Sequence, residues 1–131
     1  MTATTGSYGE FPLRSFLGMD VADDGEGRAT ARLEVGEVHL NPNGVVHGAV
    51  LFALVDTAMG KAAMSVLPEG ELTASVDLQL RFVRPVAQGS IVATVEVLKR
   101  GRHVIHLEAR VLDGGRRVVA TAAGTFTRFR V

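Results

Sequence analysis

The sequence has no cysteine among its 131 residues. This absence excludes disulfides, thiolate metal ligands and a cysteine nucleophile, and it fits a reducing compartment. Net charge is also absent, because 14 Lys and Arg balance 14 Asp and Glu, so we expect no nucleic-acid partner. No apolar run approaches the roughly 20 residues of a membrane span. The first residues have neither a basic start nor an apolar run, so we expect no signal peptide and a cytoplasmic protein.

The remaining sequence shows the patterns of regular structure. A chain of this length is expected to form one domain, here over 11–131 after a flexible tail over 1–10. Apolar alternation and periodicity predict short elements over 11–17 (helix) and 19–21 (strand), a long helix over 47–66, and strands over 28–35, 72–83, 91–98, 103–112 and 116–129. One long helix followed by a four-strand antiparallel meander indicates an α+β fold, with an antiparallel sheet wrapped around the helix. Sheet edges and the uncovered apolar face favour oligomerisation.

The strand predicted over 72–83 is long and alternates strictly. The apolar residues Val76, Leu78, Leu80 and Phe82 occupy alternate positions, and the polar residues Ser75, Asp77, Gln79 and Arg81 occupy the positions between them. This pattern predicts that the two sets lie on opposite faces of the sheet.

The helix over 47–66 is apolar on almost every side, yet it has one carboxylate, Asp56, in its middle. A buried acid without an evident partner is costly unless the protein uses it. No cation occupies the helical neighbour positions of Asp56. Desolvation should therefore raise the pKa of Asp56 toward the range of a general base. The alternative is a structural acid, bonded to the backbone or to a serine.

A tight loop, Asn41-Pro42-Asn43-Gly44, precedes this helix. Unpaired N–H groups at the helix start, near Gly48, could polarise a carbonyl oxygen that becomes negative. Gly48 and Asp56 lie about 12 Å apart along a helix that rises about 1.5 Å per residue. If both act in one reaction, Asp56 must therefore come from a second copy of the chain, across a two-fold interface.

The pattern of Asn41, Gly44 and His47-Gly48, with Asp56 nine residues after the histidine, resembles the signature of hotdog-fold acyl-CoA thioesterases. The resemblance is to the phenylacetate-pathway (PaaI-like) type, which is related to the 4-hydroxybenzoyl-CoA thioesterases. It extends over about 11–129, through 75–78, 81–85, the turn at 89, 113–115 and 119–121. It implies hydrolysis of an aryl-acetyl, aromatic or short-to-medium acyl-CoA to free acid and coenzyme A. It also implies a minimal dimer, paired again into a tetramer, and no cofactor beyond the substrate's coenzyme A.

The resemblance also implies a role for each residue of the pattern. The Gly48 N–H would polarise the thioester carbonyl with help from His47, and Asn41 would position the water or the thioester. Asp56 of the partner subunit would act as general base or nucleophile. Ala49 is a departure, because many relatives have a second glycine there, and we expect a slightly tighter site.

The resemblance also implies supporting roles for residues outside the main pattern. Ser75 would orient Asp56, although Thr73 on the same strand face could replace it. Basic side chains suit the phosphates of coenzyme A, and the alternative for each is a solvated strand edge or turn. The candidates for this role are Arg81, Arg84, Lys99, Arg100 and Arg102.

The sequence gives little support for metal-dependent or serine-hydrolase chemistry. His39, His103 and His106 have no metal-ligand spacing with the acids, so we expect no metal site. A Gly-x-Ser-x-Gly elbow is missing, which excludes the common serine-hydrolase arrangement. Two alternatives remain: a hotdog hydratase or dehydratase, and a non-catalytic acyl-CoA sensor, for which the balanced charge argues against DNA binding. The few aromatic residues do not identify the acyl group.

Overall fold

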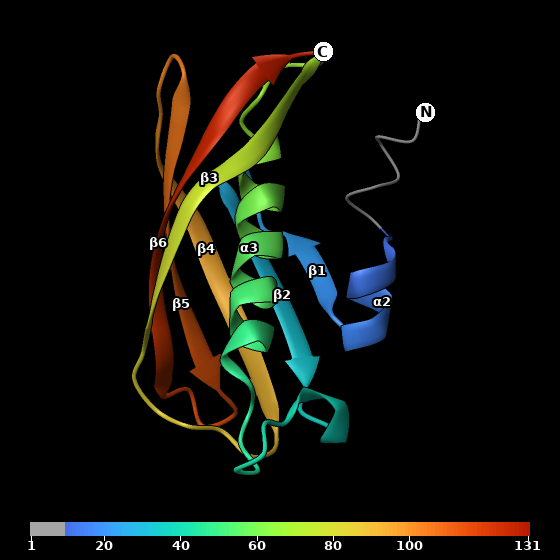
Figure 1. Ribbon diagram of the computed structural model, residues 1–131. Coiled ribbons are helices and arrows are strands. Elements are labelled where there is room, and N and C mark those ends of the chain that lie inside the picture. The colour runs from blue at the N-terminus through green and yellow to red at the C-terminus, as the bar shows by residue number, and fades with distance from the viewer. Residues whose placement is uncertain (1–9) are drawn as a thin grey trace.

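The structure is a computed structural model that describes residues 10–131. A six-stranded antiparallel sheet curves around one long helix, as Figure 1 shows. The strands are β1 Asp20–Asp23, β2 Arg28–Glu34, β3 Glu71–Phe82, β4 Ser90–Arg100, β5 Val104–Asp113 and β6 Val118–Arg130. The predicted α+β fold, with a sheet wrapped around a helix, is confirmed.

Within residues 10–131, three helical segments accompany the sheet: α2 Pro12–Leu17, the 3-10 turn η1 Glu37–His39 and the central helix α3 Gly48–Met64. The central helix is shorter at both ends than the predicted 47–66. It starts after His47, which has extended dihedrals (φ −65°, ψ 139°) and caps the helix with its side chain. The predicted tail over 1–10 lies outside the described residues except for Glu10.

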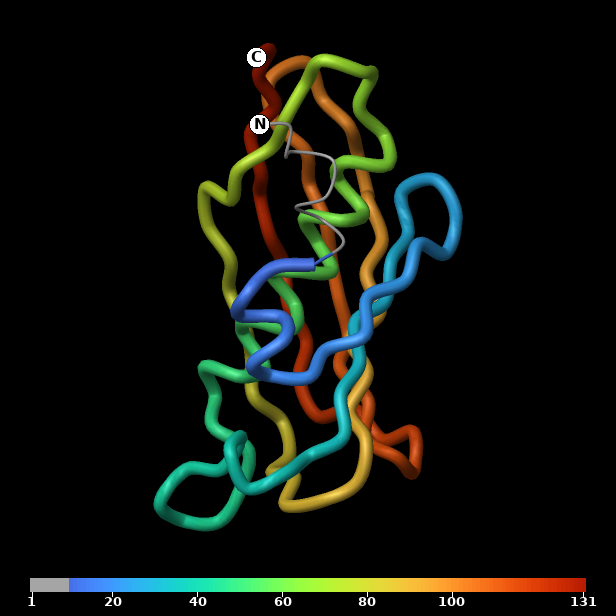
Figure 2. Tube along the Cα trace, turned by 90° about the vertical axis from the view of Figure 1, so that its right-hand side faces the viewer, coloured from blue at the N-terminus to red at the C-terminus, as the bar shows by residue number. Residues whose placement is uncertain are grey.

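The strand order is β1-β2-β4-β5-β6-β3, so the predicted meander of the last four strands is wrong in one connection. Strand β3 pairs with β6 at the sheet edge, and β4 pairs with β2 instead. The reason lies in residues 83–89, which cross the lower end of the sheet in Figure 2 rather than forming a hairpin. Pro85 interrupts this connection, and Val46 N–H donates to Val86 O at 2.8 Å, which fastens it beneath the start of α3.

Strand β3 contains a bulge that changes which side chains face the helix. Its pairing with β6 shifts between Ser75, opposite Phe126, and Asp77, opposite Thr125, so Val76 is the extra residue. Phe126 is buried in the core, and directly paired residues share a face of the sheet. Ser75 therefore lies on the helix-facing side. The strict alternation predicted for this strand is wrong at this point.

The core lies between α3 and the concave side of the sheet. Its largest fully buried side chains are Leu33, Leu54, Met59, Ile91, Ile105 and Leu107, from α3, β2, β4 and β5. Burying such side chains contributes about 1.5–3 kcal/mol each. The helix is thus held against the sheet along its length, which fixes the positions of its two ends.

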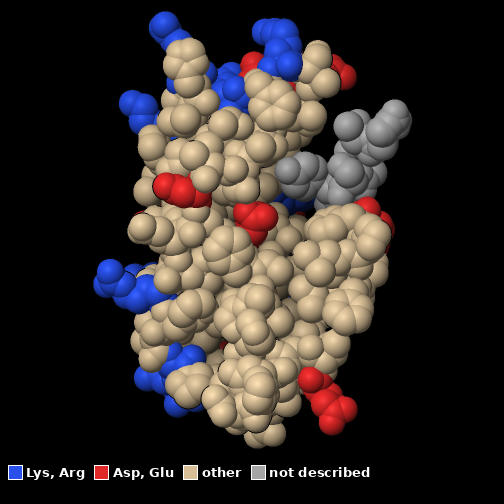
Figure 3. Space-filling view, viewed as in Figure 1, with Lys and Arg blue, Asp and Glu red and all other residues tan. Residues whose placement is uncertain are grey.

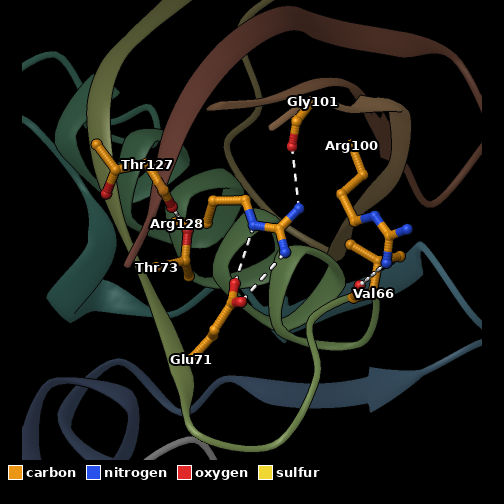
Figure 4. Close-up of polar contacts among 7 residues, drawn as sticks. All are labelled: Val66, Glu71, Thr73, Arg100, Gly101, Thr127 and Arg128. Atoms are coloured by element: carbon orange, nitrogen blue, oxygen red, sulfur yellow. Dashed lines mark hydrogen bonds and ion pairs between the residues drawn. The ribbon is translucent and has the colours of Figure 1, made fainter. Parts of the chain in front are cut away.

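Polar contacts fasten the sheet end that lies beside the last turn of α3 (Figure 4). Arg128 Nε and Nη2 donate to Glu71 Oε1 and Oε2 at 2.9 and 3.2 Å, and Nη1 donates to Gly101 O at 3.0 Å. Arg100 Nη1 donates to Val66 O at 2.9 Å. The hydrogen bond from Arg128 lowers the pKa of Glu71. This end of the molecule is therefore a structural polar cluster.

Candidate active site

The start of α3 presents a backbone donor that the fold does not use. Ala49 N–H donates to His47 Nδ1 at 2.9 Å, and Val50 N–H donates to His47 O at 2.9 Å. Gly48 N–H has no acceptor among residues 10–131. Because the His47 Nδ1 accepts a hydrogen bond, the neutral ring carries its hydrogen on Nε2. The positive end of the helix dipole thus holds a free N–H beside an imidazole donor.

Asn41 closes the loop that leads into this helix. Its Oδ1 accepts from Asn43 N–H at 2.9 Å and from Val45 N–H at 3.3 Å. Its backbone N–H donates to Val45 O at 2.8 Å, and its carbonyl accepts from Gly44, which has φ +82°. The side-chain oxygen is therefore engaged in the loop. The amide Nδ2 is the part of Asn41 that could contact a water or a thioester, so its predicted role stays a prediction.

His39 supports the same segment, and the sequence did not single it out. It is 4% exposed, Gly36 N–H donates to its Nδ1 at 2.8 Å, and its Nε2 lies 2.8 Å from Leu17 O. Since Nδ1 accepts, Nε2 must donate to that carbonyl. Its own carbonyl accepts from His47 N–H at 2.8 Å. His39 therefore ties α2 to the residue before Gly48, a role that only the tertiary structure reveals.

Asp56 lies two turns further along α3, on the partly exposed side of the helix. Its Oδ1 is buried and has no hydrogen-bond partner within the described part of the chain. Burial raises the pKa of Asp56, as predicted. The helical rise separates it from Gly48 by about 12 Å. The free N–H and the unpartnered carboxylate therefore occupy two different places on one chain.

Ser75 and Thr73 differ in how far the sheet engages them. Both lie on the helix-facing side of β3. Thr73 Oγ1 donates to Thr127 O at 2.6 Å across the sheet. The Ser75 hydroxyl makes no hydrogen bond to any other residue of the described range. Ser75 is therefore the better placed of the two to contact a neighbouring carboxylate.

The basic candidates do not gather in one place. Arg81 lies on the outer face of the sheet, because its neighbours along β3 face the helix. Arg84 lies near the helix start, and its Nη1 donates to Val118 O at 3.0 Å. Arg100 and Arg102 lie at the other end of the sheet, with Lys99. In Figure 3 Lys and Arg side chains gather at the upper end and again along the left edge of the middle and lower parts, and Asp and Glu side chains lie in the middle and at the lower right.

Two of the hollows in the surface of residues 10–131 are large enough to compare as binding sites. A cavity of about 390 Å³ opens beside Gly48, between the helix start and the connection after β3. Another hollow, of about 800 Å³, lies on the outer face of the sheet among charged side chains such as Arg28, Glu96 and Arg110. Only the first adjoins the free N–H, so it is the candidate binding site for a substrate.

The part of the chain that the structure describes shows neither a metal site nor a membrane-spanning helix. Across residues 10–131, no group of three or more His, Asp or Glu side chains is arranged to hold a metal ion. None of the helices described is both long and apolar enough to cross a bilayer.

Known proteins with the same architecture identify the family. The profile of the Thioesterase superfamily matches residues 43–120. "Putative esterase VNG_1336C" of Halobacterium salinarum is 34% identical in an alignment 129 positions long, which covers 90% of this chain and 85% of that one. The structure of Rv1847 from Mycobacterium tuberculosis, described as a putative esterase, has a TM-score of 0.87 at 31% identity and covers 92% of this chain and 98% of that chain. The Escherichia coli PaaI protein, from the phenylacetic acid degradation operon, has a TM-score of 0.87 at 26% identity and covers 98% and 91%.

The chain belongs to the Thioesterase superfamily. It has the hotdog fold, as predicted, and it is a hydrolase. The matched region contains Gly44, His47, Gly48, Asp56 and Ser75, so the free N–H and the buried carboxylate both lie in the part that defines the family.

Proposed function

We propose that this protein hydrolyses an acyl-CoA thioester to the free acid and coenzyme A, at a site shared by two subunits. The observation that carries the proposal is the buried Oδ1 of Asp56, which has no hydrogen-bond partner in residues 10–131, on the central helix of a thioesterase-family protein. A structural acid would be expected to have its hydrogen bonds satisfied within the chain. An acid with a raised pKa and a free oxygen is suited to proton transfer or nucleophilic attack.

The fold offers a way to bring Asp56 and Gly48 of different chains together. Strand β3 has 12 residues and lies at the edge of the sheet, where its outer backbone groups can pair with another strand. Phe52 on α3 and Val76 on β3 are 43% and 58% exposed, which favours a covered interface. Antiparallel pairing of two β3 strands would align the two helices in opposite directions. Asp56 of the partner subunit would then approach the start of α3.

In the proposed reaction, Gly48, His47 and Asp56 of the partner subunit each have a separate role. The thioester carbonyl oxygen accepts from Gly48 N–H, with the His47 Nε2–H beside it, and this stabilises the negative charge that develops on that oxygen. Asp56 of the partner subunit either removes a proton from an attacking water or attacks the carbonyl carbon itself. The C–S bond breaks, the acyl group gains a hydroxyl from water, and the coenzyme A sulfur gains a proton. We infer that no cofactor takes part beyond the coenzyme A of the substrate.

The coenzyme A phosphates would lie at the mouth of this site. Arg84 is the basic candidate nearest to Gly48 in the same chain. Arg100 and Arg102 lie at the opposite end of the sheet, so they would reach the same site only from the partner subunit. Arg81 faces away from α3 and is the weakest of the candidates.

The first test measures thiol release from acetyl-, hexanoyl-, benzoyl- and phenylacetyl-CoA. We expect turnover by the wild type and a loss of about 100-fold or more in Asp56→Asn, the scale of a missing general base. Absence of thiol from every ester would contradict the hydrolase proposal. A change in the acyl double bond would instead indicate a hydratase, and tight binding without turnover, unchanged in Asp56→Asn, would indicate a sensor.

A matched pair of variants tests the donor at the helix start. Gly48→Pro deletes the N–H, and proline is well tolerated at a first helical position after an extended residue. We expect a loss of about 100- to 1,000-fold in kcat, as for a missing oxyanion-hole donor. Gly48→Ala retains the N–H and should lose much less. Equal activity of the two variants would contradict the proposed role of this N–H.

Mixing the two inactive variants tests whether the site is shared. A hybrid dimer of Asp56→Asn with Gly48→Pro contains one site with both groups intact, if each site draws on both chains. Unfolding and refolding the mixture should restore about a quarter of wild-type activity, because about half of randomly formed two-fold dimers are hybrids with one complete site of two. A site within one chain would give no recovery. The predicted pairing of dimers into a tetramer is checked separately, by sedimentation equilibrium.

A further inference from the structure

The cavity beside Gly48 has a lining suited to an apolar group. Its volume of about 390 Å³ falls in the roughly 300–1,000 Å³ range of small-molecule pockets. Its lining consists of Gly48, the ring of Phe82, Arg84 and aliphatic side chains such as Val46, Leu51 and Val119. All but Arg84 are uncharged and apolar, and Arg84 donates to the carbonyl of Val118.

Phe82 forms the wall of this cavity that touches the helix start. A Cβ atom built on Gly48 would lie 3.2 Å from Phe82 Cζ and 3.4 Å from Cε1, so the ring rests against the backbone of the glycine. The ring reaches it because Phe82 is the last residue of β3 and shares the helix-facing side with Leu80 and Leu78. Glycine at position 48 provides the space that the ring occupies.

The exposure of Phe82 shows that its ring is not locked in the core. Phe82 is 58% exposed, unlike the fully buried side chains beneath α3. Substitutions there remove no core contact of the kind that would unfold the protein. Its contact with Gly48 is therefore available to shape a ligand rather than required to hold the fold.

We propose that Phe82 is a specificity-determining residue that limits the size of the acyl group, with the cavity beside Gly48 as the acyl site. The inference rests on the proposed thioesterase function. When the thioester oxygen accepts from Gly48 N–H, the first carbons of the acyl chain lie within contact distance of the Phe82 ring. The ring restricts how far a bulky or long chain can enter, and the aliphatic part of the lining favours apolar acyl groups.

The test compares Phe82→Ala and Phe82→Leu with the wild type on acetyl-, hexanoyl-, dodecanoyl- and phenylacetyl-CoA. One extra or missing methylene in a hydrophobic pocket is worth about 10- to 200-fold in discrimination. We expect the kcat/KM ratio of dodecanoyl- to acetyl-CoA to rise by at least about tenfold in Phe82→Ala, with a smaller rise in Phe82→Leu. The change should appear mainly in KM, since Phe82 contacts the acyl group and not the reacting atoms.

Phe129→Ala is the matched control. Phe129 is also an exposed aromatic side chain, at 46%, and it follows the helix-facing Phe126 by three positions along β6. Side chains alternate along a strand, so Phe129 lies on the outer face of the sheet, away from the helix-facing side on which the acyl site of each subunit lies. This variant should retain the wild-type order of substrates.

A second readout separates this inference from the proposed function. Calorimetric titration with thioether analogues of the same acyl-CoAs, which cannot be hydrolysed, ranks their affinities without turnover. Failure of the wild type to release thiol would contradict the proposed function alone, and the titrations would still report on Phe82. An acyl-length order that is unchanged in both Phe82 variants, in turnover and in affinity, would overturn the inference. Thermal melting of each variant verifies that it is folded.

Discussion

Replacing Asp56 by asparagine should lower the activity and raise the stability of the protein. Opposite changes in these two properties distinguish a catalytic acid from a structural one. Burial raises the pKa of Asp56, and its Oδ1 has no partner in residues 10–131. An acid whose pKa is raised by folding stabilises the native state while protonated, and that contribution is lost as pH rises through the folded-state pKa. The wild type therefore carries a penalty at neutral pH that Asp56→Asn does not have.

The size of this penalty follows from the environment of the carboxylate. A buried polar group without a partner costs about 1–3 kcal/mol, and more when charged. Asp56 is only partly buried, so solvent screens its charge and reduces the effect. We expect the free energy of unfolding of Asp56→Asn at pH 7 to exceed that of the wild type by about 1 kcal/mol. This corresponds to a melting temperature about 4 °C higher. The difference should disappear below the ordinary pKa of 3.8.

Urea denaturation at pH 7 and below pH 3.8, at equal protein concentration, measures this difference beside the thiol-release assay. Asp77→Asn is the control, because Asp77 is an exposed acid on the outer side of β3. It should change neither activity nor stability appreciably. Loss of stability at pH 7 in Asp56→Asn, with activity retained, would show that Asp56 is a structural acid and would refute the reasoning.

Three further predictions concern the scaffold. Gly124→Ala should destabilise by about 1–3 kcal/mol in urea, because the added methyl group would lie 2.6 Å from the buried Met59 Sδ; an unchanged midpoint would show that Met59 moves freely. His39→Ala should cost about 2–4 kcal/mol by the same measurement, since it leaves two backbone groups unpaired in a buried site; near-neutral behaviour would contradict the anchoring role. Glu71→Gln should lower stability at pH 7 but not at low pH, because the hydrogen bond from Arg128 lowers the pKa of Glu71 and its stabilising effect is lost as pH falls through the folded-state value. A pH-independent effect would argue against that pairing.

The sequence alone indicated where the helices and strands lie and supplied the catalytic candidates, whose roles stay predictions. Local signals placed α3, since the Asn-Pro-Asn-Gly loop precedes it and Pro68 with Gly70 follows it. Apolar alternation placed the strands, because a half-buried strand must present every second side chain to the core. The isolated acid in an apolar helix identified Asp56, since its burial follows from its neighbours in the same helix.

Strand neighbours and side-chain faces depended on the tertiary structure. Nothing local fixes whether β3 lies beside β4 or β6, because both pairings bury similar alternating faces. Residues 83–89 cross the end of the sheet because Val86 bonds to Val46, a contact between segments far apart in the chain. The bulge at Val76 likewise comes from pairing with β6, and it alone brings Ser75 to the helix side.

The candidate site depends both on local sequence and on contacts between segments far apart in the chain. The Gly48 N–H stays free at a helix start that is capped by His47, a local feature of the backbone, although the sequence predicted that His47 belongs to the helix itself. The Phe82 ring that rests on Gly48, and the His39 ring that holds the loop before it, are contacts between distant segments. Local sequence fixes backbone conformation through caps, turns and periodicity, whereas contacts between distant segments depend on how the sheet closes around the helix.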